Sequence, residues 1–157
     1  MRKRGDGVDR RGFLAAGGGL AAAAGVVGLA SRAVAAEMTA AERANVQVVN
    51  DFCAAWPSHN LDRIMSFFAD AGAYRMTETM EPAKGRAAVT ASVKSIIDRV
   101  EGFEVLDTFA RGPMVINERI DRFSNFALRS WHGVGVFFLK DGKIVEWYDY
   151  TISTDRG

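Results

Sequence analysis

The chain has 157 residues, enough for one globular domain, and its 48% hydrophobic and 25% charged residues are ordinary for a soluble protein. Residues 1–36 hold six Lys/Arg and two Asp/Glu, which leaves 14 basic and 17 acidic residues, a net charge of −3, from Glu37 onward. This balance gives no basic cluster that would bind nucleic acid. The single cysteine, Cys53, cannot form an internal disulfide, and no Cys/His pattern has the spacing of a metal site.

Residues 1–36 have the features of an export signal. A basic start leads through Arg10-Arg11-Gly12-Phe13-Leu14 into a run rich in Ala and Gly, followed by small residues at Ala33-Val34-Ala35-Ala36. The paired arginines resemble the twin-arginine signal, which predicts cleavage and a periplasmic or secreted product without stable membrane insertion. A membrane anchor is the alternative, although the apolar run is short for a span. The mature domain is then residues 37–157.

Three helices are predicted in the first half of this domain. Thr39-Ala40-Ala41-Glu42 is a capping box, and the apolar residues after it recur at helical spacing to about Trp56. The chain breaks at Pro57-Ser58-His59-Asn60, where Asn60 can cap a short second helix. A third apolar stripe at helical spacing predicts a helix over about residues 86–100.

Strands are predicted before the third helix, over residues 73–79, and in the second half of the chain, where the hydrophobic period changes to two. The later strands are expected over residues 103–110, 114–123, 129–139 and 143–152. Asp141-Gly142 predicts a tight turn between the last two. The order of elements predicts an α+β fold, in which a curved, mostly antiparallel sheet and three packed helices form a cone with an apolar pocket.

Two of these strands carry charged residues on apolar faces. Arg119 and Asp121 share one face, because alternate residues of a strand point to the same side, and Asp149 shares a face with Val145 and Trp147. If both faces line one cavity, it holds two carboxylates within reach of one arginine, which is the minimum for acid/base catalysis. A structural ion pair on a solvated face fits the same pattern.

These residues resemble the limonene-1,2-epoxide hydrolase family, cone-shaped domains of the wider group that includes ketosteroid isomerases and polyketide cyclases. The resemblance covers about residues 40–152. Its most specific motifs are Asn117-Glu118-Arg119-Ile120-Asp121 and Asp141-Gly142-Lys143-Ile144 leading to Trp147-Tyr148-Asp149-Tyr150. It implies that Asp121 is a catalytic acid, Asp149 a catalytic base and Arg119 the residue that orients both, with no metal or cofactor.

The resemblance also implies a set of residues that position water. Tyr74 matches a tyrosine that helps to hold the nucleophilic water. The family has an asparagine two residues further on, as a second water ligand, and Met76 stands there in this chain. A thioether is only a weak acceptor and cannot donate a hydrogen bond. Glu78, on the same predicted strand face, is a candidate to supply the missing contact; the alternative is a place at the rim.

Three further residues are predicted to form the pocket wall. Trp147 shares the face of Asp149, and His132 and Val134 share a face of the strand expected over residues 129–139. For His132, a hydrogen-bonded pocket or core histidine is favoured over a catalytic one.

The resemblance implies cofactor-independent hydrolysis of a small hydrophobic epoxide to a diol, by one-step acid/base attack of water, in a homodimer. One alternative is an isomerase or cyclase of the same fold, which the loss of the asparagine favours. A second is a non-catalytic module that binds an apolar ligand. A third is an interaction protein that pairs through its open sheet face.

Overall fold

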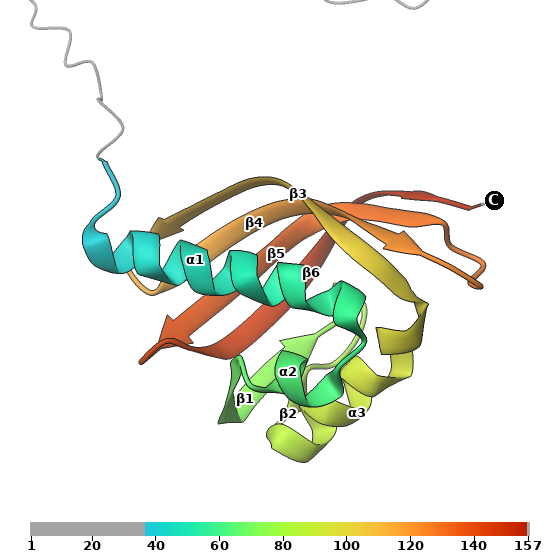
Figure 1. Cartoon of the computed structure of the whole chain (residues 1–157), viewed down its shortest axis with the longest axis horizontal. Helices are drawn as coiled ribbons and strands as arrows, with labels where there is room; N and C mark the ends of the chain where they lie inside the picture. Colours follow the sequence, from blue (N-terminus) through green and yellow to red (C-terminus); the bar gives the residue numbers. More distant parts are fainter. Residues whose placement is uncertain (1–36, 157) are drawn as a thin grey trace, which may run out of the picture. The chain divides into compact units, whose positions relative to one another are not determined.

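The structure is a computed structural model that describes residues 37–156. The predicted export signal and its paired arginines lie outside these residues. The described chain holds three α-helices, two short 3-10 helices and six strands (Figure 1). In chain order these are α1 (Ala40–Ala55), η1 (Trp56–Ser58), α2 (Leu61–Met65), β1 (Phe68–Arg75), β2 (Ala83–Lys84), α3 (Arg86–Ile96), η2 (Ile97–Arg99), β3 (Val100–Arg111), β4 (Met114–Phe123), β5 (Ser130–Lys140) and β6 (Lys143–Asp155). The predicted α+β class is confirmed.

The six strands form one sheet in the order β2-β1-β6-β5-β4-β3. Strand β1 pairs with β6 in parallel, and all other neighbours are antiparallel. The pairing of β3 with β4 shifts register between Val100 and Gly102 and again between Val105 and Asp107. Such irregularities bend a strand, and Figure 1 shows β3 and β4 curving over α1. The long strands β4, β5 and β6 lie side by side and form the surface on which the site is built.

Side-chain caps explain where the first two helices begin. Thr39 and Glu42 form the predicted capping box: the Thr39 hydroxyl accepts from the Glu42 backbone N–H at 3.2 Å, and the Glu42 carboxylate accepts from the Thr39 N–H at 2.6 Å. The same carboxylate accepts from the Gly112 N–H at 2.7 Å, which fixes the β3–β4 turn against α1. Asn60 caps α2 as predicted, accepting from the Arg63 N–H at 2.9 Å.

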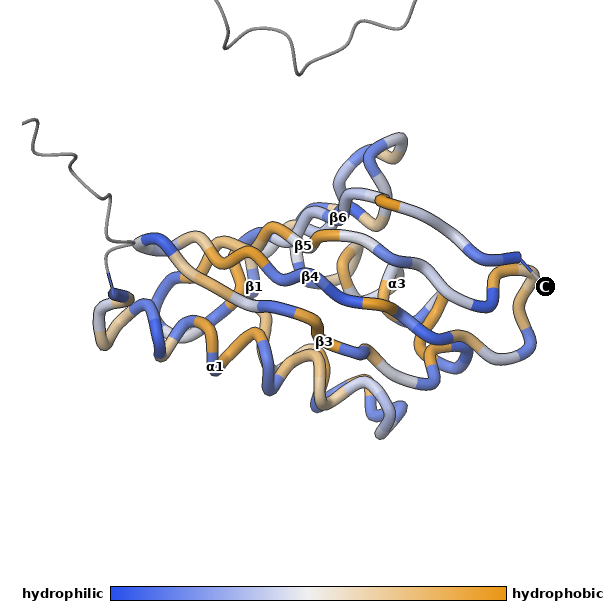
Figure 2. The backbone as a smooth tube through the Cα atoms, turned by 90° about the horizontal axis from the view of Figure 1, so that it is seen from above, coloured by the Kyte–Doolittle hydropathy of each residue, from blue (hydrophilic) through white to orange (hydrophobic). Residues whose placement is uncertain are grey.

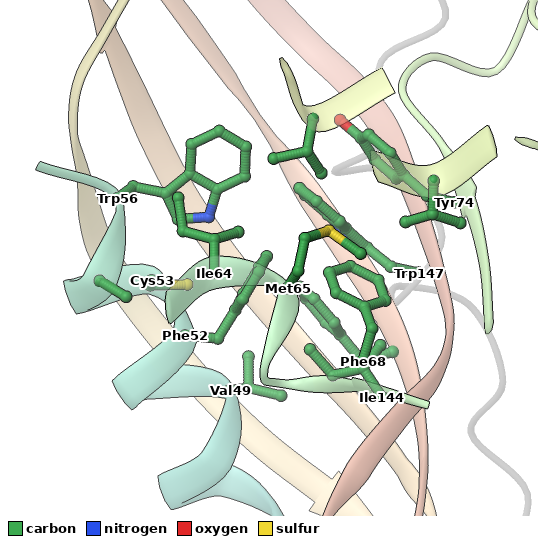
Figure 3. Close-up of a cluster of buried hydrophobic side chains, with 14 of the residues drawn as sticks. Val49, Phe52, Cys53, Trp56, Ile64, Met65, Phe68, Tyr74, Ile144 and Trp147 are labelled. Atoms are coloured by element: carbon green, nitrogen blue, oxygen red, sulfur yellow. The ribbon is translucent and has the colours of Figure 1, made fainter. Parts of the chain in front are cut away.

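The core lies between α1, α2 and the inner face of the sheet. Phe52 is fully buried and meets five aromatic rings nearly edge-on, at centroid distances of 5.0–5.9 Å. Edge-to-face contacts are a favourable aromatic geometry. Figure 3 shows Phe52 in one cluster with Phe68 and Trp147, together with Ile64 and Met65 from α2. Trp147 connects this core to the site, because the next inward-facing residue of its strand is Asp149.

The main difference from the prediction concerns the first strand. A strand was expected over residues 73–79, whereas β1 covers Phe68–Arg75 and the chain turns at residues 76–80. The pairing with β6 ends at Arg75↔Tyr148, so that the alternating residues beyond it have no ladder partner. The predicted third helix ends at Ile96 and continues as η2 to Arg99.

Candidate active site

A buried arginine of β4 holds two carboxylates. Arg119 is 0% exposed, and its Nη2 donates to both Oδ1 and Oδ2 of Asp149 at 3.0 Å. Its Nε lies 2.9 Å from Oδ1 of Asp121, but that N–H is not directed at the oxygen, so this contact is an ion pair rather than a hydrogen bond. Nη2 also lies 3.5 Å from Oδ2 of Asp121. One guanidinium thus joins the two candidate catalytic aspartates.

The sheet register explains how residues from two non-adjacent strands meet. Asp149 of β6 pairs with Gly135 of β5, and Gly135 pairs with Asn117 of β4, so Arg119 must reach across β5. A Cβ atom at Gly135 would lie 2.5 Å from Arg119 Nη1 and 3.1 Å from Asp149 Oδ1. The ion pair therefore requires a residue without a side chain at this position of the intervening strand.

Three aromatic rings surround the Arg119 guanidinium. Its Cζ lies 4.8 Å from the ring centre of Phe103, 5.1 Å from that of Trp131 and 5.4 Å from that of Trp147. Desolvated contacts of this kind stabilise a cation. Trp147 also donates from Nε1 to Asp149 Oδ1 at 2.7 Å and stacks on the Tyr74 ring at 3.9 Å. The cation is thus held by carboxylates and by ring faces.

Burial makes the two carboxyls hard to ionise, and their partners act against that effect to different degrees. Desolvation raises the pKa of Asp121 to about 7, although Arg119 opposes the shift. Desolvation also raises the pKa of Asp149, to about 6, against Arg119 and the hydrogen bond from Trp147. Burial disfavours charged Arg119 as well, but the two carboxylates outweigh burial and raise its pKa. Both carboxyls therefore keep their protons to higher pH than an ordinary aspartate does.

The carboxylates lie on the wall of an otherwise apolar cavity of about 210 Å³. Tyr74, Asp121, Trp131, Trp147 and Asp149 contribute to its lining. Apolar side chains from four parts of the chain complete most of the wall: Met76, Ile96, Phe103, Phe123, Phe126 and Leu128. A cavity of this kind, apolar with a few convergent polar groups, is typical of a site for a small molecule.

The sequence-predicted site residues fall into two groups in the structure. Arg119, Asp121 and Asp149 come together, and Tyr74, Met76 and Trp147 line the same cavity. Figure 2 shows that β4, which carries Arg119 and Asp121, has hydrophilic stretches within the sheet. The remaining predicted residues, Glu78, His132 and Val134, lie elsewhere.

Glu78 does not share the strand face of Tyr74, because β1 ends at Arg75 and Glu78 belongs to the following turn. Its carboxylate instead accepts from the Thr151 hydroxyl at 3.0 Å and from the Thr151 N–H at 3.3 Å.

The pocket placement of His132 and Val134 is wrong. Both residues lie on the outer face of β5, where His132 Nε2 is 2.8 Å from Glu118 Oε1. The inner face carries Trp131, Gly133, Gly135, Phe137 and Leu139. Both faces of this strand contain large apolar residues, and the two glycines weaken the pattern of the inner one. Hydrophobic alternation therefore favoured the wrong face.

Sequence reasoning missed Trp131, Phe103 and the two glycines as parts of the site. Gly133 has a role like that of Gly135: a Cβ atom there would lie 2.2 Å from the Trp131 ring, which folds over it. The available signal was the pair of glycines two residues apart inside a predicted strand, a pattern that marks close approach of other atoms to the backbone.

The single cysteine lies beside the site but outside the cavity wall. Cys53 is 1% exposed, and its Sγ lies 3.7 Å from the Oδ1 of buried Asn117. Burial raises the pKa of the Cys53 thiol to about 12, which keeps it protonated and unreactive.

Among residues 37–156, no group of three or more His, Cys, Asp and Glu side chains is arranged to hold a metal ion. In the same residues no helix is long and apolar enough to cross a membrane.

A family model described as a SnoaL-like domain matches residues 49–147, which include the arginine and most of the cavity wall. The chain belongs to the SnoaL-like domain family. No curated protein matches it.

Solved structures resemble this SnoaL-like domain along most of their own length. One is an epoxide hydrolase of Mycobacterium tuberculosis similar to the limonene-epoxide enzyme, with 25% identity, a TM-score of 0.61 and coverage of 73% of this chain and 85% of that one. Another is the epoxide hydrolase/cyclase-like enzyme SalBIII of pyran ring formation in salinomycin, with 19% identity, a TM-score of 0.65 and coverage of 69% and 91%. A third is a protein of ketosteroid isomerase-like fold from Catenulispora acidiphila, with 16% identity, a TM-score of 0.59 and coverage of 69% and 88%.

These neighbours place the SnoaL-like domain in a fold family that includes epoxide hydrolases, isomerases and cyclases. At the identities of the second and third neighbours, the likeness shows the fold alone. Function must be argued from the site.

Proposed function

We propose that this SnoaL-like domain is a cofactor-independent epoxide hydrolase that converts a small hydrophobic epoxide to a diol. One observation carries the proposal: buried Arg119 joins two carboxyls with different hydrogen-bond partners on the wall of an apolar cavity. Opening an epoxide with water needs a proton donor at the ring oxygen and a base for the water. Two carboxyls whose surroundings separate their pKa values supply both functions.

In the proposed mechanism, Asp149 is ionised and takes a proton from a water molecule as its oxygen attacks a ring carbon. Asp121 is protonated and donates to the ring oxygen while the carbon–oxygen bond breaks. The assignment follows the hydrogen bonds: Asp149 accepts directed bonds from Arg119 and Trp147, whereas the nearest N–H of Arg119 is not directed at Asp121. Hydrogen bonds from Trp147 and Arg119 stabilise the carboxylate of Asp149 and so favour its role as base.

A second candidate function is a cyclisation or isomerisation that begins with the same acid. Met76 lines the cavity where the epoxide hydrolase family has a water-binding asparagine, which weakens the case for an ordered water. In a cyclase, a hydroxyl of the substrate would replace water as the nucleophile and Asp149 would take its proton. Tyr74, which also lines the cavity, could orient either nucleophile.

Turnover in oxygen-18 water separates these functions. The test uses residues 37–157 with a panel of small apolar epoxides, including some that carry an internal hydroxyl. The proposed hydrolase forms a diol with one labelled oxygen, whereas a cyclase forms an unlabelled ring ether. Asp149→Asn serves as the control for background hydrolysis. If epoxides bind without reacting, the domain is a binding module and the hydrolase proposal fails.

We also propose that the mature domain is exported through the twin-arginine route and acts as a homodimer. The export proposal rests on Arg10-Arg11 and the apolar run that follows them. The dimer proposal is supported by the outer face of β5, where Val134, Val136 and Phe138 are only partly buried within one chain. Analytical ultracentrifugation of the purified domain tests the second point.

A further inference from the structure

Three residues from three parts of the chain form a directed hydrogen-bond relay beside the site. Trp131 Nε1 donates to the Thr151 hydroxyl at 3.0 Å, and that hydroxyl donates to Oε2 of Glu78 at 3.0 Å. The Thr151 backbone N–H donates to the same carboxylate oxygen at 3.3 Å. Bonds from its own backbone and from Thr151 lower the pKa of Glu78, so the relay ends on a carboxylate at neutral pH. A charged acceptor strengthens such bonds.

The first residue of this relay is part of the candidate active site. The Trp131 ring lines the cavity, and its centre lies 5.1 Å from the guanidinium carbon of Arg119. Trp131 as a whole is only 7% exposed. The ring lies over Gly133, where a Cβ atom would be only 2.2 Å from it, so the glycine leaves room for the indole in this position. The bond from Nε1 to the Thr151 hydroxyl holds the polar edge of the indole in this position.

The last residue of the relay directly follows another part of the cavity wall. Met76 and Thr77 line the cavity just after β1 loses its pairing with β6 at Arg75↔Tyr148. Glu78 follows them directly, and its bonds to Thr151 attach this segment to β6 three residues beyond the end of the ladder. One carboxylate therefore connects the Met76–Thr77 segment, beyond the end of β1, to Thr151 of β6 and through it to Trp131 of β5.

We propose that Glu78 is a positioning residue. Through Thr151 it holds the Trp131 indole over Arg119, and it also keeps the Met76–Thr77 segment against the cavity. It touches neither carboxylate of the acid/base pair in this arrangement. Its effect is therefore on the shape of the cavity and on substrate binding rather than on proton transfer. The kinetic part of this inference rests on the proposed hydrolase function, while the structural part does not.

The structural test follows the indole N–H of Trp131 by NMR in the purified domain, with its resonance assigned from Trp131→Phe. In Glu78→Ala we expect this resonance to shift and its exchange with solvent to become at least about tenfold faster, the factor that corresponds to loss of one hydrogen bond. Thr151→Val, of nearly equal size, should give the same result. Thr151→Ser and Glu78→Gln retain a hydroxyl and an acceptor and should restore most of the protection.

The matched control is Glu81→Ala, which removes another exposed carboxylate from the same connection between β1 and β2. The inference is overturned if the Trp131 resonance is unchanged in Glu78→Ala, or if Glu81→Ala changes it equally. In kinetics, Glu78→Ala should raise KM about threefold to tenfold with kcat changed less than about twofold, because ground-state and transition-state binding are lost together. A fall in kcat alone contradicts the positioning role. A wild type without epoxide turnover refutes the hydrolase proposal and leaves the NMR result to decide on Glu78.

Discussion

The indole Nε1 of Trp147 donates a 2.7 Å hydrogen bond to Oδ1 of Asp149, the next inward-facing residue on the same strand. The bond stabilises the ionised form of the carboxyl that we propose as the base. It also ties that carboxyl to the core, because Trp147 stacks on Phe137 and packs against Phe52. The site and the core thus share one side chain.

Trp147→Phe should raise the pKa of Asp149 by about one unit, since a hydrogen bond to a charged group contributes about 1.5 kcal/mol. The acid limb of the pH profile of kcat/KM should move upward by the same amount. Phe137→Leu is the control, because it disturbs the stacking on Trp147 and keeps the hydrogen bond. An acid limb that stays in place in Trp147→Phe would show that this bond does not tune the base.

Asp121→Asn and Asp149→Asn should each lower kcat for a reactive epoxide by at least about a hundredfold, the lower range for acid/base catalysis. Asn keeps the shape of Asp but supplies neither the transferable proton nor the base. Because the two residues act as a unit, the double variant should be little worse than either single one. Binding of the substrate, measured by calorimetry, should change far less. Near-normal turnover in both single variants would exclude the mechanism.

The raised pKa of Asp121 predicts a specific dependence of stability on pH. Between the ordinary value, 3.8, and about 7, the folded protein binds more protons at this residue than the unfolded chain does. The stability contributed by protonated Asp121 is therefore complete below about pH 4 and is lost as the pH rises to about 7. The free energy of unfolding of the wild type minus that of Asp121→Asn, from urea titrations, should fall over this range and level off above it. A difference that rises with pH would contradict the raised pKa.

Phe52→Ala should lower the free energy of unfolding by roughly 3–5 kcal/mol, as for other large-to-small changes of a buried aromatic residue. Phe52 is 0% exposed and meets five other rings. Phe109→Ala is the matched control, because Phe109 is 49% exposed and its truncation should cost much less. Chemical denaturation measures both. Equal losses in the two variants would mean that the core is not centred on Phe52.

Changing Arg10-Arg11 to Lys-Lys should leave the full-length precursor in the cytoplasm, because the twin-arginine receptor reads the guanidinium groups. Fractionation of the expressing cells, followed by immunoblotting for precursor and mature forms, measures the effect. Arg4→Lys keeps the paired arginines and should be processed normally. Normal processing of the Lys-Lys variant would point to the general secretory route.

Local signals predicted the elements well where a few adjacent residues decide the structure. Thr39 with Glu42, and Asn60, mark helix starts by their own hydrogen bonds. The two-residue spacing of Arg119 and Asp121 places them on one face of any regular strand, whatever the strand pairs with. Asp141 and Gly142 both adopt the positive φ that the β5–β6 turn requires.

Features that depend on distant partners could not be predicted in this way. Residues 76–79 alternate like a strand, but β6 offers no pairing beyond Tyr148, so Glu78 lies in a turn. The inner face of β5 contains Gly133 and Gly135 because Trp131 and Arg119 occupy the space above them. That space is defined by three strands together, and hydrophobic periodicity within one strand carries no information about it.

The position of β6 in the sheet also determines when the protein can fold. This strand is the last of the strands in residues 37–156, yet it lies between β1 and β5 and connects the first and second halves of the sheet. It also supplies Asp149, Trp147 and Thr151. During synthesis, therefore, the earlier strands are complete before the strand that joins them has left the ribosome. During that interval the edges of β1 and β5 that later pair with β6 are exposed. Binding of a chaperone at this stage would prevent these edges from pairing with other chains.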